Sequence, residues 1–269
     1  MISKPHTAMN FKLHIFGDYL LMKSVDYRKL RFNNITSPQF SHLLYLIFWP
    51  IYGLVFLLLE RGLKLDYTYV ACSFDNKIPF CEWFVIPYYL WFVFIAGMLV
   101  YTAFFDISAF KRYMLFIMVT YSVTCVIYVV FPNAQGLRPV TFERDNILVD
   151  IVKTLYSFDT NTNVCPSLHV VGSFAVMFAA FDTERFKTPL WRIFFFVSAV
   201  IISLSTVFLK QHSIIDVIAG LALCAVAYPV CYTIPKMREA KQKAAKLSEQ
   251  KKEKGAKKDK EKEPASANI

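Results

Sequence analysis

The chain has 269 residues, of which 56% are hydrophobic and 17% aromatic, and a formal net charge of +10. Its mean hydropathy is +0.40, which excludes an ordinary soluble domain. The basic excess does not indicate a nucleic-acid-binding protein, because it lies in a low-complexity C-terminal tail and not on a folded basic face.

Residues 1–42 mix polar and apolar residues and precede the first apolar run, so we interpret them as a cytoplasmic N-terminal segment. The stretch FKLHIFGDYLLMKSVDYRKLRF within it is typical of a helix lying flat at the membrane surface, or of an ordinary cytoplasmic lead-in. More than forty residues with several Lys and Arg before the first apolar run exclude a cleavable signal peptide.

Six apolar runs follow, most of them close to the ~20 residues that cross a bilayer as a helix. They lack the polar face that a soluble helix carries. The sequence therefore predicts an all-α polytopic membrane protein with a six-transmembrane-helix bundle over residues 43–235, the fourth helix being short. The runs lie at about 43–59, 83–105, 113–131, 167–181, 189–209 and 212–234.

The distribution of Lys and Arg predicts the orientation of the bundle, because such residues favour cytoplasmic loops. They occur in the N-terminal segment, in the second loop (Lys111, Arg112), in the fourth loop (Arg185, Lys187) and in the tail. Both termini are therefore expected in the cytoplasm, and the first, third and fifth loops outside the cell or in a lumen. The host membrane is the cell membrane or an endomembrane.

Residues 236–269 form the basic tail, with twelve basic and six acidic residues that contribute +6 to the net charge. Basic clusters beside a membrane helix attract anionic lipid head groups, by ~1 kcal/mol per charge. We interpret this segment as a cytoplasmic tail, helical or disordered, that also fixes the topology.

The six cysteines form no CxxC pair and no zinc-ligand spacing. Cys72 and Cys81 share the first outer loop, where either a disulfide or two free thiols are compatible with the compartment.

Ionisable residues at membrane segments are costly, and they are functional candidates for that reason. The sixth run opens with KQHSIIDVIAG, which places His212 and Asp216 four residues apart and on one face of a helix. Asp216 is expected to accept the Nδ1 proton of His212 and to leave Nε2 as a free lone pair. A histidine held in this way is a candidate nucleophile or base.

A second histidine, His169, begins the fourth run and is predicted at the same membrane face. Two histidines and a carboxylate at one face fit phosphoryl chemistry, in which one imidazole attacks phosphorus and the other protonates the leaving oxygen. Ser167 and the backbone N–H groups after Pro166 face the expected anion, and Arg138 offers a planar fork to it. Lys210 is a second cation candidate.

GLRP, CPSLH and STVFLKQHSIIDV resemble the three signature segments of the type 2 phosphatidic acid phosphatase superfamily, the lipid phosphate phosphatases. Three positions depart from its pattern: Phe131 replaces a lysine, Leu168 a glycine and Thr206 an arginine. The matching positions are Arg138 and Pro139 in the first segment, Pro166, Ser167 and His169 in the second, and Ser205, His212 and Asp216 in the third.

The resemblance implies a six-helix bundle whose site, at the outer face, hydrolyses a lipid phosphate or polyprenyl diphosphate. His212 would form a phosphohistidine intermediate, Asp216 would orient it and His169 would act as general acid, without a metal or other cofactor. With fewer cations, the chain also resembles the inositol phosphorylceramide synthase-like and sphingomyelin synthase-like branch, which transfers the phosphoryl-bearing group to an alcohol.

Two other classes stay open on the residues alone. His169, His212 and Asp216 match a metal site of two histidines and one carboxylate. A channel or transporter would also place polar residues in membrane segments, although the last two runs carry few of them beyond Asp216.

Overall fold

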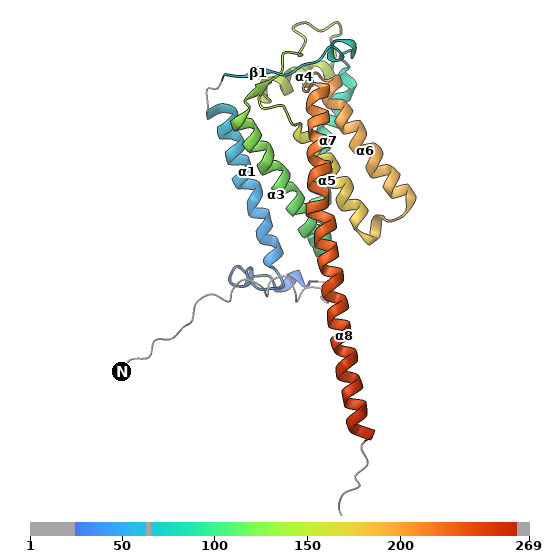
Figure 1. Ribbon diagram of the computed structural model, residues 1–269. Helices are drawn as coiled ribbons and strands as arrows, with labels where there is room; N and C mark the ends of the chain where they lie inside the picture. The colour runs from blue at the N-terminus through green and yellow to red at the C-terminus, as the bar shows by residue number, and fades with distance from the viewer. Residues whose placement is uncertain (1–24, 63–65, 263–269) are drawn as a thin grey trace, which may run out of the picture.

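Long helices joined by short connections make up most of the chain (Figure 1). The computed structural model describes residues 25–62 and 66–262. The α-helices are α1 (Phe48–Leu57), α2 (Val85–Phe105), α3 (Ile107–Val130), α4 (Ile147–Phe158), α5 (Leu168–Asp182), α6 (Pro189–Phe208), α7 (Ile214–Tyr228) and α8 (Ile234–Lys262).

Shorter elements extend or connect these helices. Two-residue strands β1 (Thr68–Tyr69) and β2 (Asn133–Ala134) pair in parallel. Single turns of 3₁₀ helix are η2 (Tyr27–Lys29), η3 (Phe32–Asn34), η6 (Asp75–Lys77), η7 (Glu82–Phe84) and η8 (Glu184–Phe186), and η4 (Ser41–Ile47) is a longer one. Two π-helical turns, η5 (Leu58–Gly62) and η9 (Pro229–Thr233), continue α1 and α7.

Five helical stretches in the described residues are long and apolar enough to cross a membrane: Ser41–Gly62, Glu82–Phe105, Ile107–Val130, Pro189–Phe208 and Ile214–Glu249. Helix α5 has 15 residues and so is only ~22 Å long, short of a ~30 Å hydrocarbon core. The all-α membrane fold is confirmed. The count of six spans is not, because α5 falls below the length of a membrane-crossing helix.

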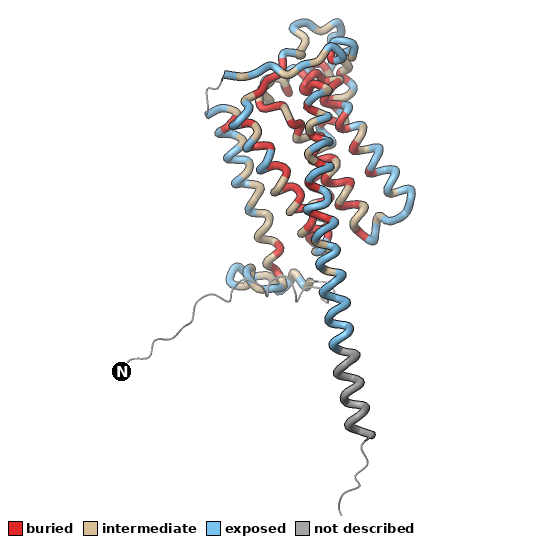
Figure 2. The backbone as a smooth tube through the Cα atoms, viewed as in Figure 1, coloured by how far each residue is buried: buried red, intermediate tan, exposed pale blue. Residues whose placement is uncertain are grey.

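Helix α5 is short because it lies at the centre of the bundle, where it packs against α2, α3, α6 and α7. Small residues on it let neighbouring helices approach closely. A Cβ added to Gly172 would lie 2.7 Å from Ile95 Cδ1 and 2.8 Å from the Tyr121 hydroxyl. The surrounding helices carry many exposed positions (Figure 2). Large apolar residues occupy many of these positions, as a helix in contact with lipid requires.

The two ends of the bundle differ in structure. The segments between α1 and α2, between α3 and α5, and between α6 and α7 gather at one end, which carries β1 and α4 (Figure 1). Helix α8 leaves from the opposite end. The loops predicted to share one face of the membrane therefore do lie together, and we call their end of the bundle the loop end.

An ion-pair cluster stabilises the opposite end. Arg112 Nε lies 2.6 Å from Asp182 Oδ2, and Arg112 Nη1 lies 2.9 Å from Glu239 Oε1. Lys236 also pairs with Asp182. These contacts connect α3, α5 and α8, so ion pairs attach the N-terminal end of α8 to the bundle.

Two predictions meet the structure only in part. Most of the proposed surface helix in the N-terminal segment lies outside the described residues, and the part from residue 25 forms short turns. Cys72 and Cys81 are free thiols in the structure, as are the other four cysteines.

Candidate functional site

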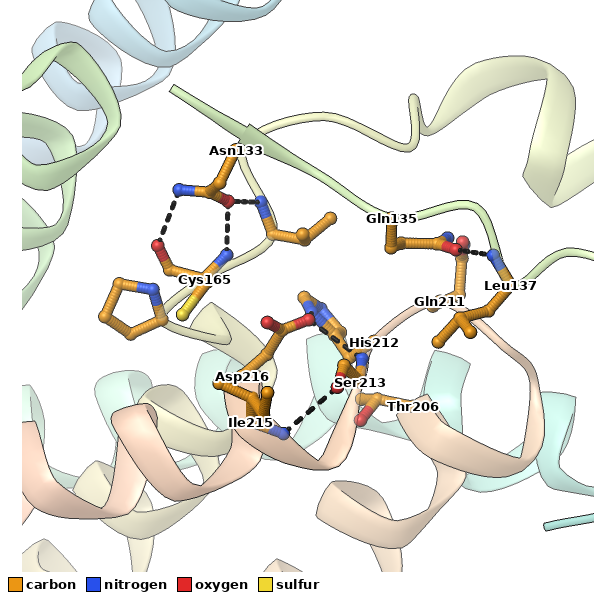
Figure 3. Close-up of polar contacts among 12 residues, drawn as sticks. Asn133, Gln135, Leu137, Cys165, Thr206, Gln211, His212, Ser213, Ile215 and Asp216 are labelled. Carbon is orange, nitrogen blue, oxygen red and sulfur yellow. Dashed lines mark hydrogen bonds and ion pairs between the residues drawn. The ribbon is translucent and has the colours of Figure 1, made fainter. Parts of the chain in front are cut away.

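His212 and Asp216 meet at the start of α7, as their spacing predicts (Figure 3). His212 Nδ1 lies 3.2 Å from Asp216 Oδ2, and both side chains are nearly inaccessible to solvent. The same carboxylate oxygen accepts the backbone N–H of Ser213 at 2.9 Å. Asp216 therefore holds the imidazole by Nδ1, which directs Nε2 away from the helix.

A tight reversal between α6 and α7 places His212. The carbonyl of Thr206 accepts the backbone N–H groups of Gln211 at 2.9 Å and of His212 at 3.1 Å. Lys210 takes a left-handed backbone conformation, with φ of 55°. Thr206 is fully buried and holds this turn through its backbone.

Asp75, from the segment between α1 and α2, caps the N-terminus of α7. Its Oδ1 accepts the Ile214 N–H at 2.9 Å, and its Oδ2 accepts the Ser213 hydroxyl and the Cys72 N–H, each at 2.7 Å. Burial by itself raises the pKa of Asp75, but these hydrogen bonds hold the pKa below its usual value. A carboxylate at a helix N-terminus also interacts favourably with the helix dipole.

The ammonium group of Lys210 is bound to that same loop. It donates to the carbonyl oxygens of Asp75 at 2.7 Å and Ile78 at 2.5 Å. Burial lowers the pKa of Lys210, against the opposing effect of Asp75. In this structure Lys210 thus attaches the segment between α1 and α2 to the turn before His212.

His169 lies close to His212 in a shell of aromatic rings. The two imidazole centroids are 6.0 Å apart. The His169 ring stacks on Tyr88, with centroids 4.2 Å apart, and lies 4.3 Å from the Trp91 centroid. Its Nε2 is buried and has no hydrogen-bond partner in the described residues. The structure therefore brings together the two histidines that the sequence predicts at one face.

Ser167 connects α5 to α7 through the backbone. Its N–H donates to the carbonyl of Asp216 at 3.1 Å, and its hydroxyl is buried without a partner in the described residues. A Cβ on Gly220 would lie 3.2 Å from the Ser167 carbonyl oxygen, so the two helices approach closely here. The thiol of Cys165 lies beside Asp216; its burial and that carboxylate raise its pKa to about 12.

Arg138 lies within the loop end and is largely paired. Its guanidinium donates to the carbonyls of Tyr156, Asp159 and Thr160 at 2.8–3.1 Å, and to Gln211 Oε1. Its charge also lies 4.6 Å from the Tyr156 ring centroid. The Nε–H group is buried and unpaired within the part of the chain that the structure describes.

Asn133 fixes the segment that leads into α5 (Figure 3). Its Oδ1 accepts the backbone N–H groups of Val164 and Cys165 at 2.8 and 2.7 Å, and its Nδ2 donates to the carbonyl of Cys165 at 3.0 Å. Sequence reasoning did not single out Asn133 or Asp75. Both act through contacts between residues far apart in sequence, which local spacing does not reveal.

An apolar cavity of about 810 Å³ extends from the two histidines into the bundle. Trp49, Gly53 and Phe56 of α1 line it, together with residues of α2. His169, His212, Gln211, Asp159 and Thr160 form its polar end. The volume lies within the range of known ligand pockets, ~300–1,000 Å³.

No group of three His, Cys, Asp or Glu side chains in the described residues is arranged to hold a metal ion. Chelation is the direct test of that alternative.

These features define a multi-pass membrane protein with two neighbouring histidines at one end of an apolar cavity. A family model described as the PAP2 superfamily matches residues 109–240, from α3 to the start of α8. The chain belongs to this superfamily, and the matched segment includes all six predicted site residues. No curated protein and no solved structure matches the chain.

Proposed function

We propose that the protein is a lipid phosphatase that hydrolyses a lipid phosphate or a polyprenyl diphosphate through a phosphohistidine on His212. The observation that carries this proposal is the position of His169 and His212 at the polar end of the apolar cavity. A cavity lined from α1 and α2 suits a lipid chain, and two imidazoles suit the transfer of a phosphoryl group.

In the first step, His212 Nε2 attacks phosphorus and the bond to the lipid oxygen breaks. His169 gives its proton to that oxygen, and Asp216 stabilises the positive charge on His212. In the second step, His169 accepts a proton from water as the water attacks, the P–N bond breaks and inorganic phosphate leaves. The unpaired Nε2 of His169 supports its part in both transfers.

The phosphate itself needs hydrogen-bond donors. The unpaired Ser167 hydroxyl and Arg138 Nε–H are available to it, whereas the other groups of Arg138 would have to exchange partners. Lys210 is the third candidate and would have to leave the carbonyls of Asp75 and Ile78.

A second candidate function is transfer of the phosphoryl-bearing group to an alcohol. It is favoured by the small number of cations at the site, where Phe131 and Thr206 replace two basic residues of the family pattern. Both functions share the formation of the phosphohistidine and differ in the acceptor.

In the membrane, we propose that the loop end faces outside or into a lumen and that both termini are cytoplasmic. The basic tail then lies beside anionic head groups of the cytoplasmic leaflet.

The test is release of free phosphate by protein purified in detergent, with EDTA present, from a panel of lipid phosphates and diphosphates. We expect release from the wild-type protein, and a loss of at least ~10³-fold in His212→Ala, which removes the nucleophile. Asp145→Asn, at an exposed carboxylate, is the control. Activity lost on chelation would support a metal site, and full activity in His212→Ala would contradict the proposal.

A further inference from the structure

One ionisable group in the cavity wall has no part in the proposed mechanism: the carboxylate of Asp159, at the end of α4. Its Oδ2 accepts the Tyr88 hydroxyl at 2.8 Å and the Gln211 Nε2–H group at 3.2 Å. No hydrogen bond within the described part of the chain reaches its Oδ1. Asp159 lines the cavity together with both histidines.

The neighbours of Asp159 connect it to each histidine. Tyr88, which donates to the carboxylate, stacks on the ring of His169. Gln211, the other donor, directly precedes His212 in the chain and also accepts from Arg138. Asp159 is thus held in place by residues that contact or adjoin both catalytic candidates.

A carboxylate is a poor partner for a phosphate, because both are anionic. Its oxygen atoms accept hydrogen bonds, and a hydroxyl is a ligand group that donates them without adding charge. Burial raises the pKa of Asp159 above its usual value, more than Tyr88, His212 and Arg138 lower it. Holding this carboxylate in the cavity wall therefore costs stability, which is typical of a group kept for function.

We propose that Asp159 binds a hydroxyl group of a substrate through Oδ1, beside the reacting phosphorus. The inference rests on the proposed function, since it concerns the acceptor or head group of that reaction. Tyr88 and Gln211 are positioning residues that hold Oδ2 and so direct Oδ1 into the cavity.

When the hydroxyl belongs to an acceptor alcohol, it takes the place of water in the second step. Its oxygen attacks the phosphorus of phosphohistidine, the P–N bond breaks and its proton passes to His169. The products are a phosphate ester and free His212. Asp159 keeps its charge throughout and orients the hydroxyl.

The same hydroxyl chemistry has a second source, the polar head group of the donor lipid. Two measurements distinguish the sources. In the first, phosphatidic acid is the donor and glycerol is added, and the ratio of glycerol phosphate to free phosphate is measured. In the second, a phosphatidylglycerol donor, which carries head-group hydroxyls, is compared with phosphatidic acid without added glycerol. The KM is measured from the release of diacylglycerol, which both donors lose when the lipid P–O bond breaks; the phosphoryl-bearing group then leaves His212 as glycerol phosphate or as free phosphate.

The variants are Asp159→Ala and Asp159→Asn, with Asp145→Asn as the control at an exposed carboxylate before the other end of α4. The product ratio is informative even where a variant is partly damaged, because both products come from one intermediate. An acceptor site predicts that Asp159→Ala lowers the ratio roughly tenfold while Asp145→Asn leaves it unchanged. A head-group site predicts a roughly tenfold rise in KM for phosphatidylglycerol alone.

Either result supports the inference and identifies the source of the hydroxyl. If Asp159→Ala keeps both the wild-type product ratio and the wild-type KM for phosphatidylglycerol, the hydroxyl subsite is overturned, and the proposed phosphatase function is unaffected. Failure of the wild-type protein to transfer phosphate to water or to glycerol contradicts the proposed function, and the hydroxyl subsite with it.

Discussion

At the scale of single residues, the loop end contains two carboxylates, Asp75 and Asp159, whose hydrogen bonds differ. Asp75 is fully hydrogen-bonded, so its pKa is lowered despite burial. Asp159 accepts hydrogen bonds on one oxygen, and burial raises its pKa. The first carboxylate therefore stabilises the fold when ionised, and the second destabilises it.

This difference predicts how folding stability changes with pH. The pKa of Asp159 is higher in the folded protein than its usual value of 3.8, so the folded state binds more protons. The contribution of Asp159 to the free energy of unfolding therefore falls as the pH rises from about 4 through the folded-state pKa. We expect Asp159→Asn to gain thermal stability relative to the wild type over that window.

The measurement is the thermal unfolding temperature of both proteins in detergent, at intervals from about pH 4 to pH 8. Asp145→Asn should follow the wild type. A difference between Asp159→Asn and wild type that is constant with pH would show that the carboxyl does not titrate as proposed.

The contacts of Lys210 favour a structural role for this residue over a role in binding phosphate. Because its ammonium donates to two carbonyls of the loop between α1 and α2, we expect Lys210→Met to lower the free energy of unfolding by ~2 kcal/mol. The KM for a lipid phosphate should change little. Lys77→Met, at an exposed lysine of the same loop that lies over the Phe74 ring, is the matched control.

A large rise in KM with unchanged thermal stability would reverse this assignment. It would show that the ammonium exchanges its carbonyls for substrate phosphate.

At the scale of elements, α5 determines how the bundle packs. A Cβ on Gly172 would meet Ile95 Cδ1, the Tyr121 hydroxyl and Trp91 Nε1 at 2.7–2.9 Å, so these side chains of α2 and α3 would have to shift. Gly97 of α2 has nothing within 4 Å of such a Cβ. The two glycines therefore form a matched pair on packed and open faces.

We expect Gly172→Ala to lower the free energy of unfolding by about 1–3 kcal/mol through overpacking. Gly97→Ala should be neutral or stabilise its helix by up to ~1 kcal/mol. Unfolding of both variants in detergent, followed by circular dichroism, checks this. Equal effects would mean that α5 adjusts its position without strain.

The helices and the His212–Asp216 pair could be predicted from the sequence because both depend on local spacing. Apolar runs define the long helices, and a separation of four residues places two side chains on one helix face. Helix α5 is the predicted span that the structure does not confirm. A helix packed against four others need not match the bilayer thickness.

Other parts of the site depend on contacts between residues far apart in the chain, which local sequence spacing does not predict. Asp75 caps a helix that begins 139 positions later in the chain, and Asp159 meets Tyr88 across 71 positions. Both are ordinary acidic residues of loops in the sequence. The signature segments located Arg138 correctly at the loop end, but its pairing with backbone carbonyls arises from the fold of residues 156–160.

At the scale of the whole molecule, the cavity connects the polar chemistry of the loop end with the apolar interior of the bundle. Helix α1 packs on α3, and its Gly53 lines the cavity with no atom within 4 Å of an added Cβ. A large side chain at that position would enter the cavity without disturbing the histidines. It would compete with a lipid chain and leave the phosphate site open.

We therefore expect Gly53→Phe to lower kcat/KM for a long-chain lipid phosphate by about tenfold, equivalent to ~1.4 kcal/mol. A short-chain, water-soluble phosphate should be hydrolysed nearly as fast as by the wild type, because it places little chain in the cavity. Gly97→Phe adds the same ring at an open position that does not line the cavity, and should affect neither substrate. If Gly53→Phe slowed both substrates equally, the cavity would have to be treated as a part of the fold and not as the site of the lipid chain.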